Sequence, residues 1–150
     1  MQANGIASAV LFSCLLITAS VWDVKKRIIP DTLCLLMALV GLLSLSPTKL
    51  FGIFIALPLF IAAICKDGSV GGGDIKLTAA IGIVTGFPVG IFGLILSLTA
   101  SIAFYLVNQM VRKLRGLPPL TAKQIALPMA PFLCFGFLTA YFMNIGGLLS

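Results

Sequence analysis

Residues 77–111 carry no charged side chain, and this apolar stretch limits the folds open to the chain more than any other feature. It is longer than the roughly 20 residues that one helix needs to cross a bilayer. Of the 150 residues, 60% are hydrophobic and 9% are charged, and the mean hydropathy is +1.18. Soluble domains carry roughly 25% charged residues. The sequence therefore predicts an all-α, polytopic membrane protein rather than a soluble domain.

Charged and turn-forming residues divide the chain into six apolar segments, which we expect to form one transmembrane domain over residues 1–150. A break at residues 86–88 splits the long apolar stretch, because Pro88 cannot continue a helical hydrogen-bond ladder. The fourth segment would cover only roughly 20 Å, so either the bilayer thins there or the segment begins below the membrane surface. The helices are expected at about residues 5–22, 32–46, 50–65, 74–86, 89–111 and 125–149, the last with Pro128 and Pro131 in its first turns.

The placement of lysine and arginine predicts the orientation of the helices. Nine of the ten basic residues fall in or beside the first, third and fifth loops, and only Lys49 falls on the other side. These three loops are therefore expected in the cytoplasm, and both termini outside it. The net charge of +6 favours contact with an anionic inner leaflet, so a nucleic-acid partner is not needed to explain it.

The sequence gives no support for metal or cofactor chemistry. It contains no histidine, and its four cysteines are widely spaced, without a Cys-x-x-Cys pair. Zinc sites draw on such residues. Packing as small hydrophobic side chains is the expected role of Cys14, Cys34, Cys65 and Cys134. We therefore expect neither a metal nor a cofactor.

Only four acidic residues are present, and all of them are aspartates. Asp31 follows Pro30 at the start of the second helix, where aspartate is a favoured cap, and Asp67 lies in a loop where a solvated charge is expected. Asp23 ends the first helix and Asp74 begins the fourth, both on the predicted cytoplasmic side. Ionisable groups at membrane depth are functional candidates. Capping or pairing with a basic neighbour would also account for each of the two taken singly.

Gly71, Gly72 and Gly73 directly precede Asp74. Successive glycines are entropically costly at a helix start, but they let a substrate backbone approach closely. A phosphate-binding loop with Lys76 as counter-ion is the competing use. The spacing differs from that of a P-loop, and an acid beside the phosphate would repel it. The three glycines are therefore interpreted as an active-site loop.

Two segments resemble the signatures of the type IV prepilin peptidases, a family of intramembrane aspartyl proteases. Residues 23–30 read Asp-Val-Lys-Lys-Arg-Ile-Ile-Pro and are similar to the first signature, an aspartate followed by a basic residue and Ile-Pro. Residues 71–76 read Gly-Gly-Gly-Asp-Ile-Lys and resemble the second signature, G-x-G-D-x-K. Residues 127–132 look like the proline-containing start of the family's last helix. Many members have asparagine at the position of Asp31, and both residues cap helices well.

The resemblance implies an endopeptidase that removes the short basic leader from pilin-like precursors at the cytoplasmic face of the inner membrane. Asp23 and Asp74 would be the catalytic pair and would share one proton, with base and acid assigned to neither singly. Lys76, Arg27 and Pro30 are candidate supporting residues. The chain lacks the cysteine-paired segment of larger members and resembles the short, peptidase-only form of Flp (tight-adherence) pilus systems, so no N-methyltransferase activity is expected. The sequence does not predict the oligomeric state.

Three alternatives remain open on the residues alone. Asp23 and Asp74 could form the relay of a small transporter or proton-conducting protein, although both lie near one face and no half-length repeat is evident. A metal-dependent enzyme acting on lipid phosphates would need more clustered carboxylates than these two. A noncatalytic assembly subunit is disfavoured because both signature acids are intact.

Overall fold

The computed structural model describes residues 3–26, 29–43, 47–65, 71–116 and 128–146, and these are almost entirely helical, with no strand among them. The all-α prediction is therefore confirmed. Residues 47–65 run continuously through α3, η1 and α4, so the described chain forms six helical segments. The elements are α1 (Ala3–Lys26), α2 (Asp31–Leu43), α3 (Pro47–Leu50), the 3-10 helix η1 (Phe51–Ala56), α4 (Leu57–Cys65), α5 (Gly72–Thr85), α6 (Phe87–Leu114) and α7 (Ala130–Ile145).

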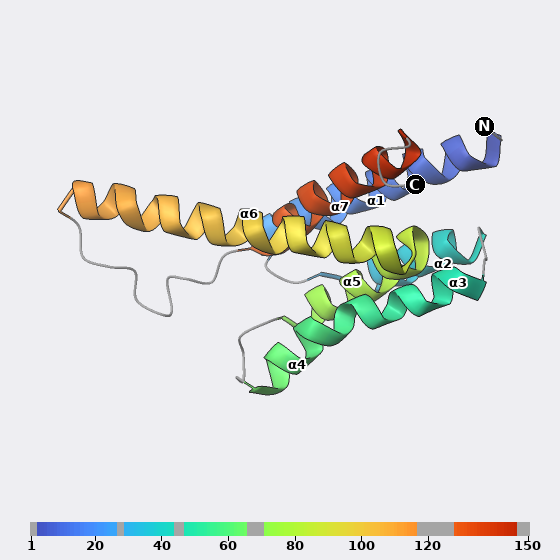
Figure 1. The fold of residues 1–150 in the computed structure, drawn as a ribbon, viewed down its shortest axis with the longest axis horizontal. Coiled ribbons are helices and arrows are strands. Elements are labelled where there is room, and N and C mark those ends of the chain that lie inside the picture. The colour runs from blue at the N-terminus through green and yellow to red at the C-terminus, as the bar shows by residue number, and fades with distance from the viewer. Residues whose placement is uncertain (1–2, 27–28, 44–46, 66–70, 117–127, 147–150) are drawn as a thin grey trace.

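The helical segments alternate in direction along the long axis of the molecule (Figure 1). The ends of α1, α4 and α6 and the starts of α2, α5 and α7 point to the same side. We call this side the basic end, because it carries all the described basic residues except Lys49. These residues are Lys25, Lys26, Lys76, Arg112, Lys113 and Arg115. The charge asymmetry of the sequence is therefore also an asymmetry in space.

Helix α5 is the central helix of the bundle. It packs mainly against α2 and η1 and also contacts α3, α6 and α7. Every other helix carries exposed large hydrophobic side chains, whereas α5 has none. Its 14 residues would span roughly 21 Å, which agrees with the short fourth helix expected from the sequence. Because its neighbours enclose it, α5 need not match the thickness of a surrounding bilayer.

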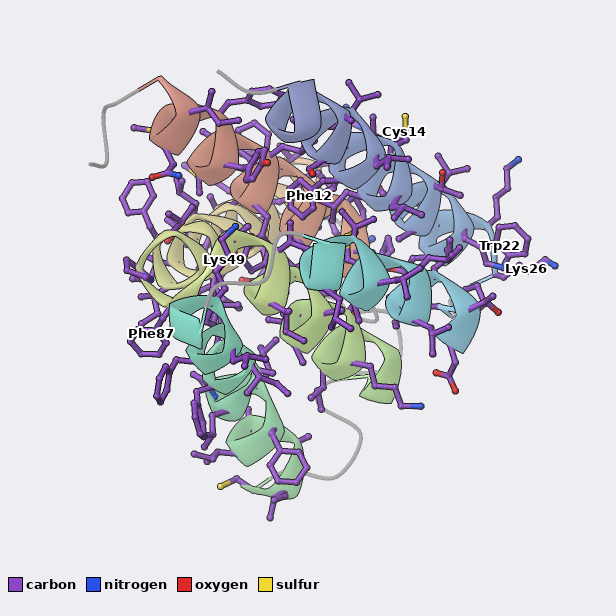
Figure 2. The ribbon with its side chains drawn as sticks, turned by 90° about the vertical axis from the view of Figure 1, so that its right-hand side faces the viewer. Phe12, Cys14, Trp22, Lys26, Lys49 and Phe87 are labelled. Atoms are coloured by element: carbon purple, nitrogen blue, oxygen red, sulfur yellow. The ribbon has the colours of Figure 1, made fainter. Side chains whose placement is uncertain are left out.

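The first and last helices pack side by side. The ring centroids of Phe12 in α1 and Tyr141 in α7 lie 4.8 Å apart, and both Phe12 and Phe137 are fully buried. Figure 2 shows Phe12 pointing between these helices, whereas Cys14 and Trp22 point outward from α1. The packing of these two antiparallel helices brings the end of α1, which carries Asp23, beside the start of α7.

The break between α5 and α6 is made by glycine rather than by proline, which corrects the expectation. Gly86 has a φ of 80°, a left-handed conformation that favours glycine, and its N–H donates to the carbonyl of Gly82 at 2.8 Å. Pro88 lies within the first turn of α6, where proline is well tolerated. Helix α6 therefore begins two residues earlier than expected.

Two other expected helices also differ from the structure. The third segment contains the 3-10 turn η1, which the apolar pattern did not predict. The last helix begins at Ala130, so Pro131 lies in its first turn and Pro128 precedes it. Proline cannot supply the N–H that a helix interior needs, which explains why the regular helix starts beside these residues. The expected start at residue 125 lies outside the described residues.

Two of the described helices are long and apolar enough to cross a membrane, namely α1 over Ala7–Lys26 and α6 over Phe87–Leu114. The other apolar helices are shorter. Large hydrophobic side chains are exposed along the outer faces of the bundle, among them Leu35, Phe60, Ile95 and Phe135. Contiguous exposure of this kind marks a surface that contacts lipid or another protein.

Replacing Gly82 by alanine is expected to destabilise the fold by about 1–3 kcal/mol, because the added methyl group would meet the backbone of Gly52 in η1. Gly72→Ala is the matched control, since a methyl group there meets nothing within 4 Å. Thermal unfolding of the purified protein measures both effects. Equal melting temperatures for the two variants would contradict the close approach of α5 and η1.

Candidate active site

A pocket of about 260 Å³ opens at the basic end of the molecule. It lies between the end of α1, Ile29 and the start of α5. Both aspartates singled out in the sequence and all three glycines line it, together with one further acid that the sequence suggested was a helix cap. The lining residues are Asp23, Ile29, Asp31, Gly71, Gly72, Gly73 and Asp74. The fold thus brings together two segments that are about 50 residues apart in the chain.

Asp23 is held in place by the last helix. Its side chain is only 6% exposed, and its Oδ2 accepts a hydrogen bond of 3.0 Å from the backbone N–H of Ala130. Ala130 is the first residue of α7, whose leading N–H groups have no partner within the helix. The partial positive charge at this helix terminus favours an adjacent carboxylate. This bond joins residues that are 107 positions apart.

Asp74 lies in the first turn of α5 in a different environment. Its Oδ1 is buried and has no hydrogen-bond partner among the described residues. A buried carboxylate oxygen without a partner carries a desolvation cost. Asp74 lines the same pocket as Asp23. The two carboxylates therefore differ, since Asp23 accepts a hydrogen bond from a backbone amide and Asp74 has a buried oxygen without a described partner.

The three glycines provide space rather than an unusual backbone. Gly71 is extended, with φ −67° and ψ 136°, and Gly72 and Gly73 begin α5 without positive φ angles. A Cβ on Gly71 would lie 3.1 Å from Oδ2 of Asp74, and one on Gly73 would lie 3.1 Å from Cβ of Ile29. A Cβ on Gly72 would point into open space. The loop therefore leaves room beside the Asp74 carboxylate.

Lys76 is paired with Asp31 rather than with the two buried acids. Its Nζ lies 2.8 Å from Oδ1 of Asp31, and the Lys76 and Asp31 side chains are 60% and 75% exposed. Lys76 therefore lies at the surface beside the pocket and is absent from its described lining.

Pro30 is the remaining candidate residue that the structure describes. Pro30 immediately precedes α2, and its carbonyl accepts a hydrogen bond from the N–H of Leu33, so it helps to start that helix. Arg27 and Asp67 lie outside the described residues. Within the described part of the chain, no group of three or more histidine, cysteine or acidic side chains is placed to hold a metal ion.

Two contacts of the site were not anticipated from the sequence. The pairing of Asp31 with Lys76 crosses from α2 to α5, and the expected capping role gave no indication of it. The donation from Ala130 to Asp23 comes from a backbone group, so no side-chain type marks it. The proline-rich start of the last helix was the available signal, because it indicates where unpaired helical N–H groups lie.

The fold and the pocket together define a small helical protein with a pair of carboxylates at one end. Residues 10–107 match the model of the type IV leader peptidase family. The match covers 98 of the 150 residues, and the chain belongs to this family. It is therefore a peptidase of the kind that processes type IV pilin-like precursors. No curated protein and no solved structure matches the chain.

The family match includes both segments that line the pocket, residues 23–31 and 71–74. It ends before α7, so the Ala130 amide that holds Asp23 lies beyond the matched residues. The prediction of a prepilin-peptidase-type family from the two signatures is confirmed.

Proposed function

We propose that this peptidase is an aspartyl endopeptidase in which Asp23 and Asp74 form the catalytic pair. The observation that carries the proposal is that both carboxylates line one pocket. Two carboxylates that share one proton can activate water and polarise a peptide carbonyl at the same time. The pair titrates as a unit, so base and acid are assigned to neither carboxylate alone.

The proposed reaction adds one water molecule across a peptide bond. The ionised carboxylate takes a proton from water, and the water oxygen bonds to the carbonyl carbon. The protonated carboxyl donates a hydrogen bond to the carbonyl oxygen and stabilises the negative charge that develops there. The carbon–nitrogen bond then breaks, and the leaving nitrogen takes a proton from the pair. Each turnover restores the pair with one shared proton.

The proposed substrate is a pilin-like precursor with a short basic leader, and the proposed location is the inner membrane. The exposed apolar faces support six membrane-crossing segments, with the enclosed α5 as the short one. The basic end, which holds the pocket, is proposed to face the cytoplasm, where anionic lipid would attract its lysines and arginines. Both termini would then lie outside. The spacing of the cysteines supports a peptidase without N-methyltransferase activity, as in Flp-type systems.

The position of the two acids disfavours the transporter alternative. Asp23 and Asp74 line one pocket at one end of the bundle, and Asp23 is the only buried charged residue among those described. A pathway across the membrane would place ionisable or polar groups along its length and near the midplane.

Asp23→Asn and Asp74→Asn are each expected to lower cleavage of an Flp-type precursor by at least about 10³-fold, because either change removes half of the acid–base pair. The double variant should lose little more than either single variant, since the two groups act as a unit. The measurement is shortening of the precursor in bacterial membranes, with insertion of each variant verified separately. Cleavage at the parent rate by both single variants would overturn the proposed pair.

Gly71→Ala is expected to lower the turnover number more than Gly72→Ala. The methyl group on Gly71 would press on Oδ2 of Asp74 at 3.1 Å, whereas the one on Gly72 would meet no protein atom within 4 Å. Displacing a reacting group by a fraction of an ångström costs a large part of the rate. Steady-state kinetics of the two variants on one precursor provide the comparison. The reverse order of turnover numbers would contradict a catalytic position for the Asp74 carboxylate.

A further inference from the structure

The third acid of the pocket, Asp31, has no role in the proposed reaction. It lies in the first turn of α2 and lines the same pocket as Asp23 and Asp74, but its side chain is 75% exposed. Asp23 is buried and bonded to α7, and Asp74 is partly buried in the first turn of α5. Asp31 is therefore the pocket carboxylate that a side chain arriving from solvent reaches first.

The charges of the pocket are complementary to a cation. Three of its seven described lining residues are acidic and none is basic. Lys76 is the cation paired with Asp31, and it approaches from the surface without lining the pocket. Exposed ion pairs of this kind contribute little net stability, because water solvates both partners well when they separate. One cation at Asp31 can therefore be exchanged for another at small cost.

We propose that Asp31 binds a lysine or arginine side chain of the substrate close to the scissile bond, and that Lys76 is an internal cation that competes for the same carboxylate. Asp31 is then a specificity-determining residue rather than a catalytic one. The proposal rests on the proposed peptidase function and adds to it a basis for selecting a basic leader. Substrate binding would break the Lys76–Asp31 contact and form an equivalent contact with the leader.

Asp31→Asn and Lys76→Gln distinguish this role from a purely structural one, because the two variants should change KM in opposite directions. Asp31→Asn removes the carboxylate and should raise KM by about three- to tenfold, with kcat little changed. Lys76→Gln removes the competitor and should lower KM for the same precursor. If the pair only ties α2 to α5, both variants lose the same contact, and KM should change in the same direction in both. That result would overturn the proposal.

A second precursor sharpens the test. In it, the basic residues of the leader are changed to glutamine, and the KM ratio of Asp31→Asn to parent should then fall to about one. Raising the salt concentration should reduce the same ratio for the basic precursor, since the contact is exposed. A charge reversal completes the design: Asp31→Lys should cleave a precursor with glutamate in place of the leader cation better than it cleaves the basic precursor. A KM ratio that is the same for both leaders would refute the contact.

Failure of this inference differs from failure of the proposed function. If the parent protein leaves the precursor intact, or if Asp23→Asn still cleaves it, the aspartyl mechanism is wrong and Asp31 has no leader to select. If cleavage depends on Asp23 and Asp74 but KM is indifferent to Asp31, the mechanism stands and the specificity proposal alone is wrong.

Discussion

A carboxylate buried in an apolar helical bundle loses its hydration and must find a partner or take up a proton, and the arrangement of this protein depends on that constraint. Asp23 has its partner in the Ala130 N–H at the free terminus of α7. Asp74 has a buried oxygen without a partner among the described residues. One acid anchored by an amide and one without such an anchor on that oxygen thus line a single pocket. The first and last helices must pack together for this to occur, which gives the Phe12–Tyr141 contact its importance.

The second constraint is the enclosure of α5. A helix that starts inside a bundle can present a carboxylate to a pocket only if its neighbours cover the rest of it. The close approach of Gly52 and Gly82 allows η1 to cover one side of α5, and Gly41 of α2 lies against Ile83 and Val84, so that α2 covers another. Small residues at such contacts let helix backbones approach closely in the absence of a hydrophobic driving force. The glycines along this helix therefore have two uses, since those at its start leave room at the pocket and Gly82 allows packing.

The sequence predicted those features that depend on residue type. Asp23 and Asp74 stood out because acids are scarce in an apolar chain, and the two signatures that contain them are enough to indicate the family. Features that depend on backbone groups or on exchange between exposed charges were not predicted. A break at Gly86 and one at Pro88 look alike in sequence, and only the positive φ of Gly86 separates them. The Ala130 amide is a backbone group, so no residue type marks it. An aspartate at position 31 is compatible both with capping α2 and with pairing to Lys76, and the sequence does not distinguish the two.

The distribution of charge also indicates how a basic leader could be selected at a basic surface. Lysines and arginines at the ends of α1 and α6 would repel a positively charged peptide, yet anionic lipid around them would attract both the protein and the leader. Near the membrane, the acidic pocket is then the place on the described protein where a leader cation meets complementary charge. Such charges act mainly on encounter and specificity, whereas the proposed cleavage depends on Asp23 and Asp74. In these proposals, the same residue type serves recognition where Asp31 is exposed and chemistry where Asp23 is buried.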